Sequence, residues 1–107
     1  MAYTGKVLAD GQVADTAGDL YTVPGATVAF VRSFTIWNTS GGSETVIVYI
    51  DTGGGPRIVA RVVLAANEGA DILEGGSSWV LNASVKIQAE TTTATTVDFV
   101  ITGVESA

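Results

Sequence analysis

Short runs of β-branched and aromatic residues, separated by glycine-rich segments, are the feature of this sequence that most limits its fold. Residues 46–50 read VIVYI and residues 97–101 read VDFVI, while the segments between such runs include SGGS at 40–43 and GGGP at 53–56. Runs bounded by glycine and proline are typical of strands in sandwiches and barrels, and no run has a helical period. The pattern predicts an all-β chain, namely a two-sheet antiparallel β-sandwich, jelly-roll or immunoglobulin-like, with about eight strands.

Two runs indicate which side chains should face the core. In residues 27–38 the apolar face also contains Arg32, which predicts a β-bulge near residues 32–33 or an open sheet edge. That apolar face comprises Val28, Phe30, Phe34 and Ile36. In residues 57–64, Arg57 and Arg61 mark the face expected to be wetter. The opposite face, expected in the core, comprises Ile58, Ala60, Val62 and Leu64.

Residues 1–19 are less patterned than the rest of the chain. They are rich in Gly, Asp and Ala, and their apolar anchors are Tyr3, Val7 and Leu8. A segment with so little apolar surface has little to bury by itself. We therefore expect residues 1–19 to be an N-terminal arm that orders against a neighbour on assembly, and residues 20–107 to be the β-sandwich domain.

The composition removes several kinds of chemistry. The 107 residues include no cysteine and no histidine, which excludes thiolate metal sites, thiol nucleophiles and the Ser/His/Asp triad. The formal net charge of −6, with five basic residues, argues against nucleic-acid binding. The N-terminus has no signal-peptide apolar region, and no apolar run approaches the ~20 residues of a membrane helix. We expect a soluble chain made in a cytoplasm, without nucleic-acid or membrane partners.

The Asp-Thr-Gly at 51–53 fits two structures. An apolar run ending in these letters resembles the active-site loop of aspartic proteases, and a chain with one such loop must dimerise so that two carboxylates share a proton. Glycines 54 and 55 stand where that family usually has alanine or serine, and no convincing bracing motif follows. DTGGGP is also typical of a hairpin in which glycine supplies positive φ and Asp51 caps its own turn. We favour the turn and keep a dimeric aspartic protease as a minor alternative.

Neither a phosphate loop nor a metal site is expected. The segments GGGPR, SGGSE and LEGGSS lack the Gly-Lys-Ser/Thr ending of a phosphate loop and lead into no helix. A calcium site would draw on Asp51, Asp71, Glu74 or Asp98, but no stretch has the ligand spacing of a calcium loop. The sequence therefore predicts no cofactor and no metal.

The aromatic residues are candidates for sugar stacking or for contacts between subunits. Trp37 has the parity opposite to Ile36, which predicts that it lies on the outer face of its strand, where a large aromatic suggests an interface. No cluster of Asp, Asn and Gln flanks the aromatics, so we favour an interface over a sugar platform. The aromatic residues considered for these two roles are Tyr3, Tyr21, Trp37, Tyr49 and Trp79.

Residues 20–51, LYTVPGATVAFVRSFTIWNTSGGSETVIVYID, resemble a pattern that recurs in small virion proteins of tailed bacteriophages. The shared elements are the Leu-Tyr-Thr-Val-Pro entry, a strand ending in Asn-Thr, a Gly/Ser turn and a following apolar strand. The opening MAYTGKVLADGQ and the ending VDFVITGVES are similar to the ends of the same proteins, whereas residues 64–81 depart from the usual glycine-rich link. The resemblance implies a structural protein and carries over no catalytic residues.

The resemblance implies a non-enzymatic component of the virion, assembled in the host cytoplasm. The role we expect is a capsid decoration or cement protein that bridges capsid subunits. Its partners would be the major capsid protein or other virion proteins, and copies of itself, with a trimer favoured. A tail or fibre module that binds host surface glycans through Trp37 or Trp79 is the alternative. The residues expected at partner contacts are Tyr3, Lys6, Trp37, Arg57, Arg61 and Trp79.

Overall fold

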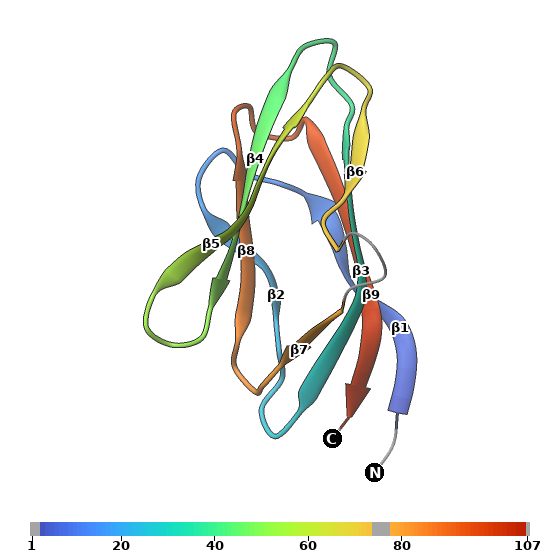
Figure 1. Cartoon of the computed structure of the whole chain (residues 1–107), viewed down its shortest axis with the longest axis vertical. Helices are drawn as coiled ribbons and strands as arrows, with labels where there is room; N and C mark the ends of the chain where they lie inside the picture. The colour runs from blue at the N-terminus through green and yellow to red at the C-terminus, as the bar shows by residue number, and fades with distance from the viewer. Residues whose placement is uncertain (1–2, 74–77, 107) are drawn as a thin grey trace.

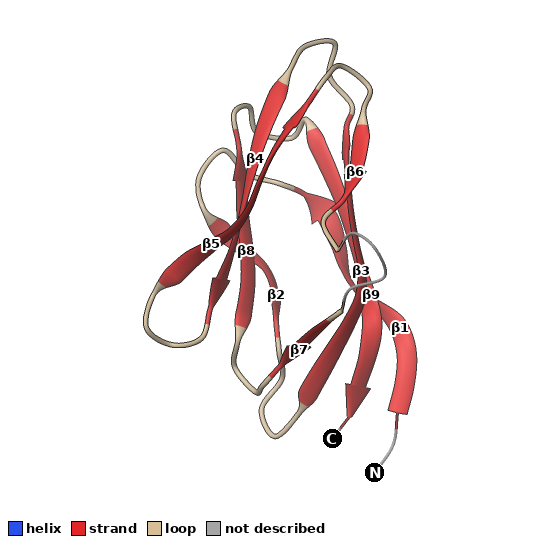
Figure 2. Ribbon diagram, in the orientation of Figure 1, coloured by secondary structure: helices blue, strands red, loops and turns tan. Residues whose placement is uncertain are grey.

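The computed structural model describes residues 3–73 and 78–106, and these residues form strands and turns without any helix (Figure 2). No segment among them could cross a membrane as a helix. Because the apolar runs are short and end at glycine-rich turns, each becomes a strand. The nine strands are β1 (Tyr3–Gln12), β2 (Gly18–Thr22), β3 (Val28–Asn38), β4 (Glu44–Asp51), β5 (Pro56–Leu64), β6 (Gly69–Asp71), β7 (Trp79–Leu81), β8 (Lys86–Thr91) and β9 (Val97–Ser106).

The strands form two antiparallel sheets that face each other as layers (Figure 1). Sheet A has the order β1-β9-β3-β6, with β7 also paired to β3, and sheet B has the order β2-β8-β4-β5. The expected all-β, two-sheet antiparallel sandwich is thus confirmed. Strands β1 to β4 alternate between the sheets, and this order favours the jelly-roll alternative over the immunoglobulin-like one.

The core lies between the inner faces of the two sheets. Its fully buried side chains include Phe34 and Ile101 from sheet A and Val46, Val48 and Ile87 from sheet B. Burying such side chains contributes roughly 1.5–3 kcal/mol each relative to leaving them in water, which makes this layer the main source of stability.

A β-bulge in β3 changes which residues face the core. The pairing of β3 with β9 shifts register between Val31 and Ser33, where the sequence predicted a bulge. Before the shift the buried residues are Ala29 and Val31, and after it they are Phe34 and Ile36. The prediction that Val28 and Phe30 share a face with Phe34 and Ile36 is therefore wrong, because the extra residue reverses the alternation.

A second bulge lies in β5. The residues opposite β4 pass from Ala60 to Ile58, which leaves Val59 as the extra residue. Arg57 consequently lies opposite Ile50 and Arg61 opposite Ile47, and these two β4 residues point to opposite faces of sheet B. The prediction that both arginines share one face is wrong for this reason.

The same bulge removes Ile58 from the core. Ile58 lies opposite Tyr49 on the outer side of the sheet and is 58% exposed, whereas it was expected to be buried. Leu64, at the other end of β5, is buried as expected.

Most of the segment 1–19 belongs to the sheets of this single chain. β1 pairs with β9 along its whole length, and the backbone N–H of Val13 donates to the Val97 carbonyl oxygen at 2.9 Å. β2 begins at Gly18 and pairs with β8. The idea that residues 1–19 order on assembly stays a prediction.

Candidate interaction surfaces

Asp51 lies at the end of β4 and closes the hairpin to β5. Its Oδ1 accepts hydrogen bonds from the backbone N–H groups of Gly53 at 2.8 Å and Gly55 at 3.3 Å. Gly53 and Gly55 have φ values of 116° and 103°, which side-chain-bearing residues rarely adopt. This geometry matches the turn interpretation of Asp-Thr-Gly.

Lys6 is part of a polar link between the sheets. Its Nζ lies 2.6 Å from Oε1 of Glu105, while the Tyr21 hydroxyl donates to Oε2 of the same carboxylate at 2.5 Å. The hydrogen bonds from Lys6 and Tyr21 hold the pKa of Glu105 below its ordinary value. This predicted contact residue is thus already bound within the chain. Tyr3, also a predicted contact residue, lies opposite Ser106 in the pairing of β1 with β9. The structure does not describe its side chain.

The two tryptophans lie on opposite faces of sheet A. Trp37 is 49% exposed on the outer face, and its ring packs so closely over Gly69 that a Cβ there would come within 2.3 Å of it. Trp79 lies opposite the buried Val31 and meets Phe34 edge-on, with ring centroids 6.2 Å apart. The outward position predicted for Trp37 is confirmed, but the two rings form no shared platform.

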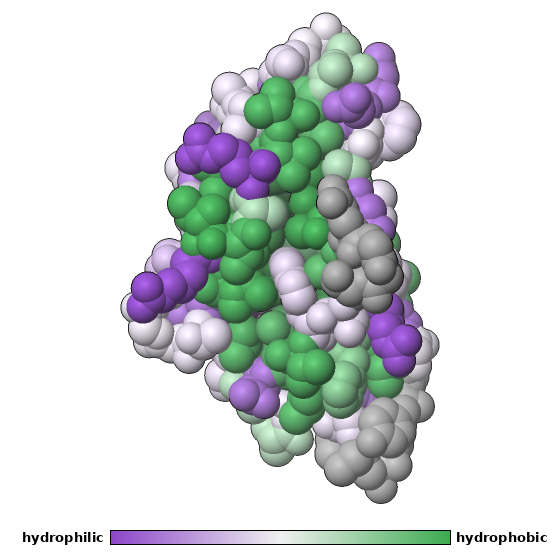
Figure 3. Space-filling model, in the orientation of Figure 1, coloured by the Kyte–Doolittle hydropathy of each residue, from purple (hydrophilic) through white to green (hydrophobic). Residues whose placement is uncertain are grey.

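The edge strand β5 carries an exposed apolar strip, which we define as Ile58, Val59 and Val63. Their side chains are 58%, 46% and 63% exposed. Arg57 precedes the strip and Arg61 lies between Val59 and Val63, both on exposed positions. Figure 3 shows apolar surface extending along the side of the molecule where β5 runs. The sequence did not predict this strip, because simple alternation placed Ile58 in the core. Pro56 was the feature that could have indicated an exposed edge strand, since proline within sheets occurs mainly on edge strands.

A second surface covers the outer face of sheet A. Its apolar members Val7, Val80 and Val100 are exposed on β1, β7 and β9. Beside Val7 lies an open groove of about 450 Å³, bordered by Arg32 at the β3 bulge and by Val104. The surface is broad and mixed in character, which suits a protein contact better than a small-molecule site.

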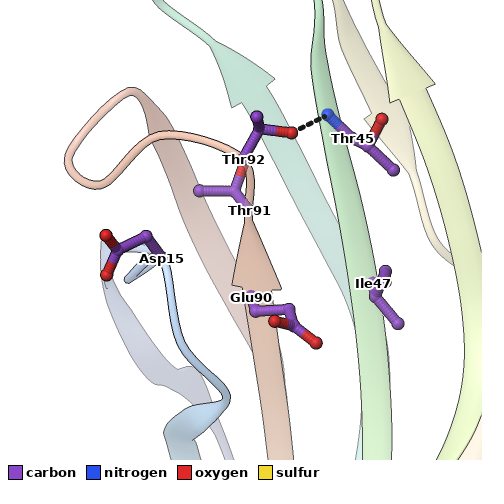
Figure 4. Close-up of a pocket in the computed structure, with 6 residues that line it drawn as sticks. All are labelled: Asp15, Thr45, Ile47, Glu90, Thr91 and Thr92. Atoms are coloured by element: carbon purple, nitrogen blue, oxygen red, sulfur yellow. Dashed lines mark hydrogen bonds between the residues drawn. The ribbon is translucent and has the colours of Figure 1, made fainter.

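A smaller hollow of about 250 Å³ lies beside β8 and β4 (Figure 4). The Glu90 side chain extends toward Ile47, whereas Asp15 lies on the other side of β8, and the Thr45 backbone N–H donates to the Thr92 hydroxyl at 3.2 Å. Glu90 also accepts a hydrogen bond from the Tyr49 hydroxyl. Among residues 3–73 and 78–106, no three His, Cys, Asp or Glu side chains group as a metal site. The calcium candidate Glu74 lies outside the described residues.

Comparisons with known proteins identify similar folds without a family. No family model matches the chain, and no curated protein matches it. A Bacillus endospore appendage, described as belonging to a novel family of disulfide-linked pili, has 16% sequence identity and a TM-score of 0.60, over 98% of this chain and 88% of its own. Two structures of a pentameric capsid protein isolated from metagenomic phage sequences have 17% identity and TM-scores of 0.42 and 0.43. They match 91% of this chain and 65% and 58% of their own.

At 16% sequence identity, the similarity to the endospore appendage protein shows a shared fold and no more. One chemical difference is plain, since this chain has no cysteine and cannot form the disulfide links named for that family. A joint between copies of this sequence therefore cannot be a disulfide.

Proposed function

We propose that this chain is a non-enzymatic structural protein of a bacteriophage particle that decorates the capsid and bridges neighbouring capsid subunits. The observation that carries the proposal is the exposure of large apolar side chains along regular strands of both sheets, including Val63 on β5 and Trp37 on β3. Rigid strands that present apolar residues with arginines beside them are suited to burial against another protein. The resemblance of residues 20–51 to phage virion proteins is the reason for proposing a bacteriophage particle as the assembly to which the chain belongs.

Decoration of a capsid needs only modest affinity at each site. A symmetric shell repeats the same joint many times, so weak contacts made by an oligomer add up through multivalency. The proposed location is the virion and the proposed partner is the major capsid protein. Self-association, with the trimer favoured by the sequence analysis, belongs to the same proposal.

Capsids that lack this protein provide the test. We expect purified protein to co-sediment with them, to saturate at a fixed ratio to capsid subunits and to raise their resistance to heat. Trp37→Ala should weaken binding about tenfold because it removes the largest exposed aromatic side chain, whereas Trp37→Phe, which keeps an aromatic ring, should bind nearly normally. Absence of saturable binding would overturn the capsid role.

Two other functions have direct tests. Of the two tryptophans proposed for glycan binding, Trp37 is the exposed one and Trp79 faces the core, so a glycan-binding protein would lose its affinity in Trp37→Ala. We expect no glycan binding by the wild-type chain or by this variant. A dimeric aspartic protease would cleave peptides at acidic pH and lose this activity in Asp51→Asn; because Asp51 already accepts two backbone N–H groups of its own turn, we expect no cleavage by either form.

A further inference from the structure

The free edge of sheet B includes one regular segment of open backbone. β5 is the last strand of this sheet, and residues 60–64 pair without interruption with residues 44–48 of β4. The earlier part of β5 is interrupted by Pro56 and by the bulge at Val59, which are features that block strand pairing. The unprotected part is therefore the five-residue segment 60–64, which includes Val63, the most exposed large apolar residue of the strip.

The charge of this edge restricts its partner. Residues 56–64 contain Arg57 and Arg61 and no acidic residue, in a chain of formal charge −6. The ion pairs within the described residues are Lys6 with Glu105 and Lys86 with Asp19, so both β5 arginines are available. In a β5-to-β5 pair neither strand would supply a carboxylate to balance the arginines that it brings to each face of the joint, which is unfavourable. An acidic strand is the better partner.

The opposite edge of sheet B is such a strand. β2 is five residues long, has a register shift of its own between Asp19 and Tyr21, and carries Asp19, which is exposed. Asp19 lies opposite Gln88, and Gln88 lies opposite Tyr49 on the outer face of β4. Arg61 lies opposite Ile47, on that same outer face. Asp19 and Arg61 thus stand on one face of the sheet, at its two edges.

The strand directions also agree. Each neighbouring pair in the order β2-β8-β4-β5 is antiparallel, so β2 and β5 run in opposite directions. Across sheet B, Asp19 lies at the level of Ile58, so β2 faces the interrupted part of β5 when copies stand level. A second copy in the same orientation, but displaced along the strands by a few residues, would bring its β2 against residues 60–64 of the first as an antiparallel pair.

We propose that β5 of one copy pairs with β2 of the next, so that sheet B continues from copy to copy with Arg61 beside Asp19 of its neighbour. The joint is heterologous and generates a ring if the rotation between copies closes, or a filament if it does not. The apolar strip on β5 adds buried area to the backbone hydrogen bonds. This joint between copies stands whether or not the protein binds capsids.

Sedimentation velocity of the purified protein over a range of concentrations tests the joint. The wild-type chain should self-associate, and more weakly as salt is raised. Arg61→Glu and Asp19→Arg should each weaken association about tenfold or more, because each places like charges across the joint. An equal mixture of the two variants should regain association, since both kinds of joint in the mixture then pair opposite charges.

Two controls separate the joint from other effects. Arg32→Glu reverses an exposed arginine on sheet A and should associate as the wild type does. Lys86→Gln removes the ion pair that Asp19 makes within its own chain and should also leave association intact. Circular dichroism should report the same folded state for every variant.

Three results would overturn the proposal. The first is a wild-type chain that remains monomeric at its highest soluble concentration. The second is unchanged association of Asp19→Arg alongside loss in Arg61→Glu, which would indicate a joint that does not use β2. The third is failure of the mixed variants to associate although each is folded.

Discussion

Glu44 is a carboxylate that the fold buries at the start of β4, where it is 6% exposed. Burial by itself would raise its pKa, but Oε1 accepts hydrogen bonds from the Thr93 backbone N–H at 2.8 Å and from the Thr96 and Thr91 hydroxyls at 2.9 and 3.3 Å. These bonds outweigh the desolvation and leave the pKa of Glu44 below its ordinary value of 4.5. One side chain thereby ties β4 to the turn between β8 and β9.

The lowered pKa of Glu44 makes stability depend on acid. A carboxyl group whose pKa is lower in the folded than in the unfolded state stabilises the fold above its unfolded value, and this contribution is lost as pH falls through the folded value. We expect the free energy of unfolding to decline below about pH 4.5, and Glu44→Gln to show less of this decline. Urea titrations at several pH values measure it. Equal pH dependence in both proteins would contradict the assignment.

At the scale of elements, the bulges in β3 and β5 decide which side chains these two strands present on each face. The bulge in β3 could be predicted from the sequence, because Arg32 interrupts an apolar face that resumes two residues later. The bulge in β5 is not, because Val59 and its neighbours are all compatible with a buried strand. In both cases the extra residue sends the following side chains to the other face of the sheet.

Gly103 should be indispensable for the pairing beside the β3 bulge. A Cβ at this position would lie 2.1 Å from the Phe30 carbonyl oxygen, which is backbone and cannot rotate away. We expect Gly103→Ala to lower the free energy of unfolding by about 3 kcal/mol or to prevent folding. Gly5→Ala, on the adjacent strand with no atom within 4 Å of its added Cβ, is the control and should change stability little. Thermal unfolding of both variants compares them, and equal melting temperatures would refute this view of Gly103.

At the scale of the whole molecule, the sheets are joined by more than apolar packing. Lys6 on β1, Glu105 on β9 and Tyr21 on β2 connect the outer strand of sheet A to the outer strand of sheet B. The link lies along the side of the sandwich away from β5.

Removing the Tyr21 hydroxyl should loosen this connection. Tyr21→Phe keeps the buried ring but takes away a hydrogen bond to a carboxylate, which we expect to cost about 1.5 kcal/mol in the free energy of unfolding. Tyr49→Phe removes a comparable bond to Glu90 on the outer face of sheet B and should cost less, because both partners belong to one sheet. Denaturant unfolding measures the difference. A larger loss in Tyr49→Phe would argue against a link between sheets.

The sequence by itself determined the all-β class, the two-sheet antiparallel sandwich, the hairpin at Asp51 and the outward position of Trp37. These follow from local alternation and from turn chemistry, which depend on neighbours in the chain. Only the tertiary structure decided that Arg57 and Arg61 lie on opposite faces, that Lys6 is bound to Glu105, and that Trp79 faces the core. Those outcomes depend on register, which hydrogen bonding to strands far away in the sequence sets, and one inserted residue is enough to reverse it.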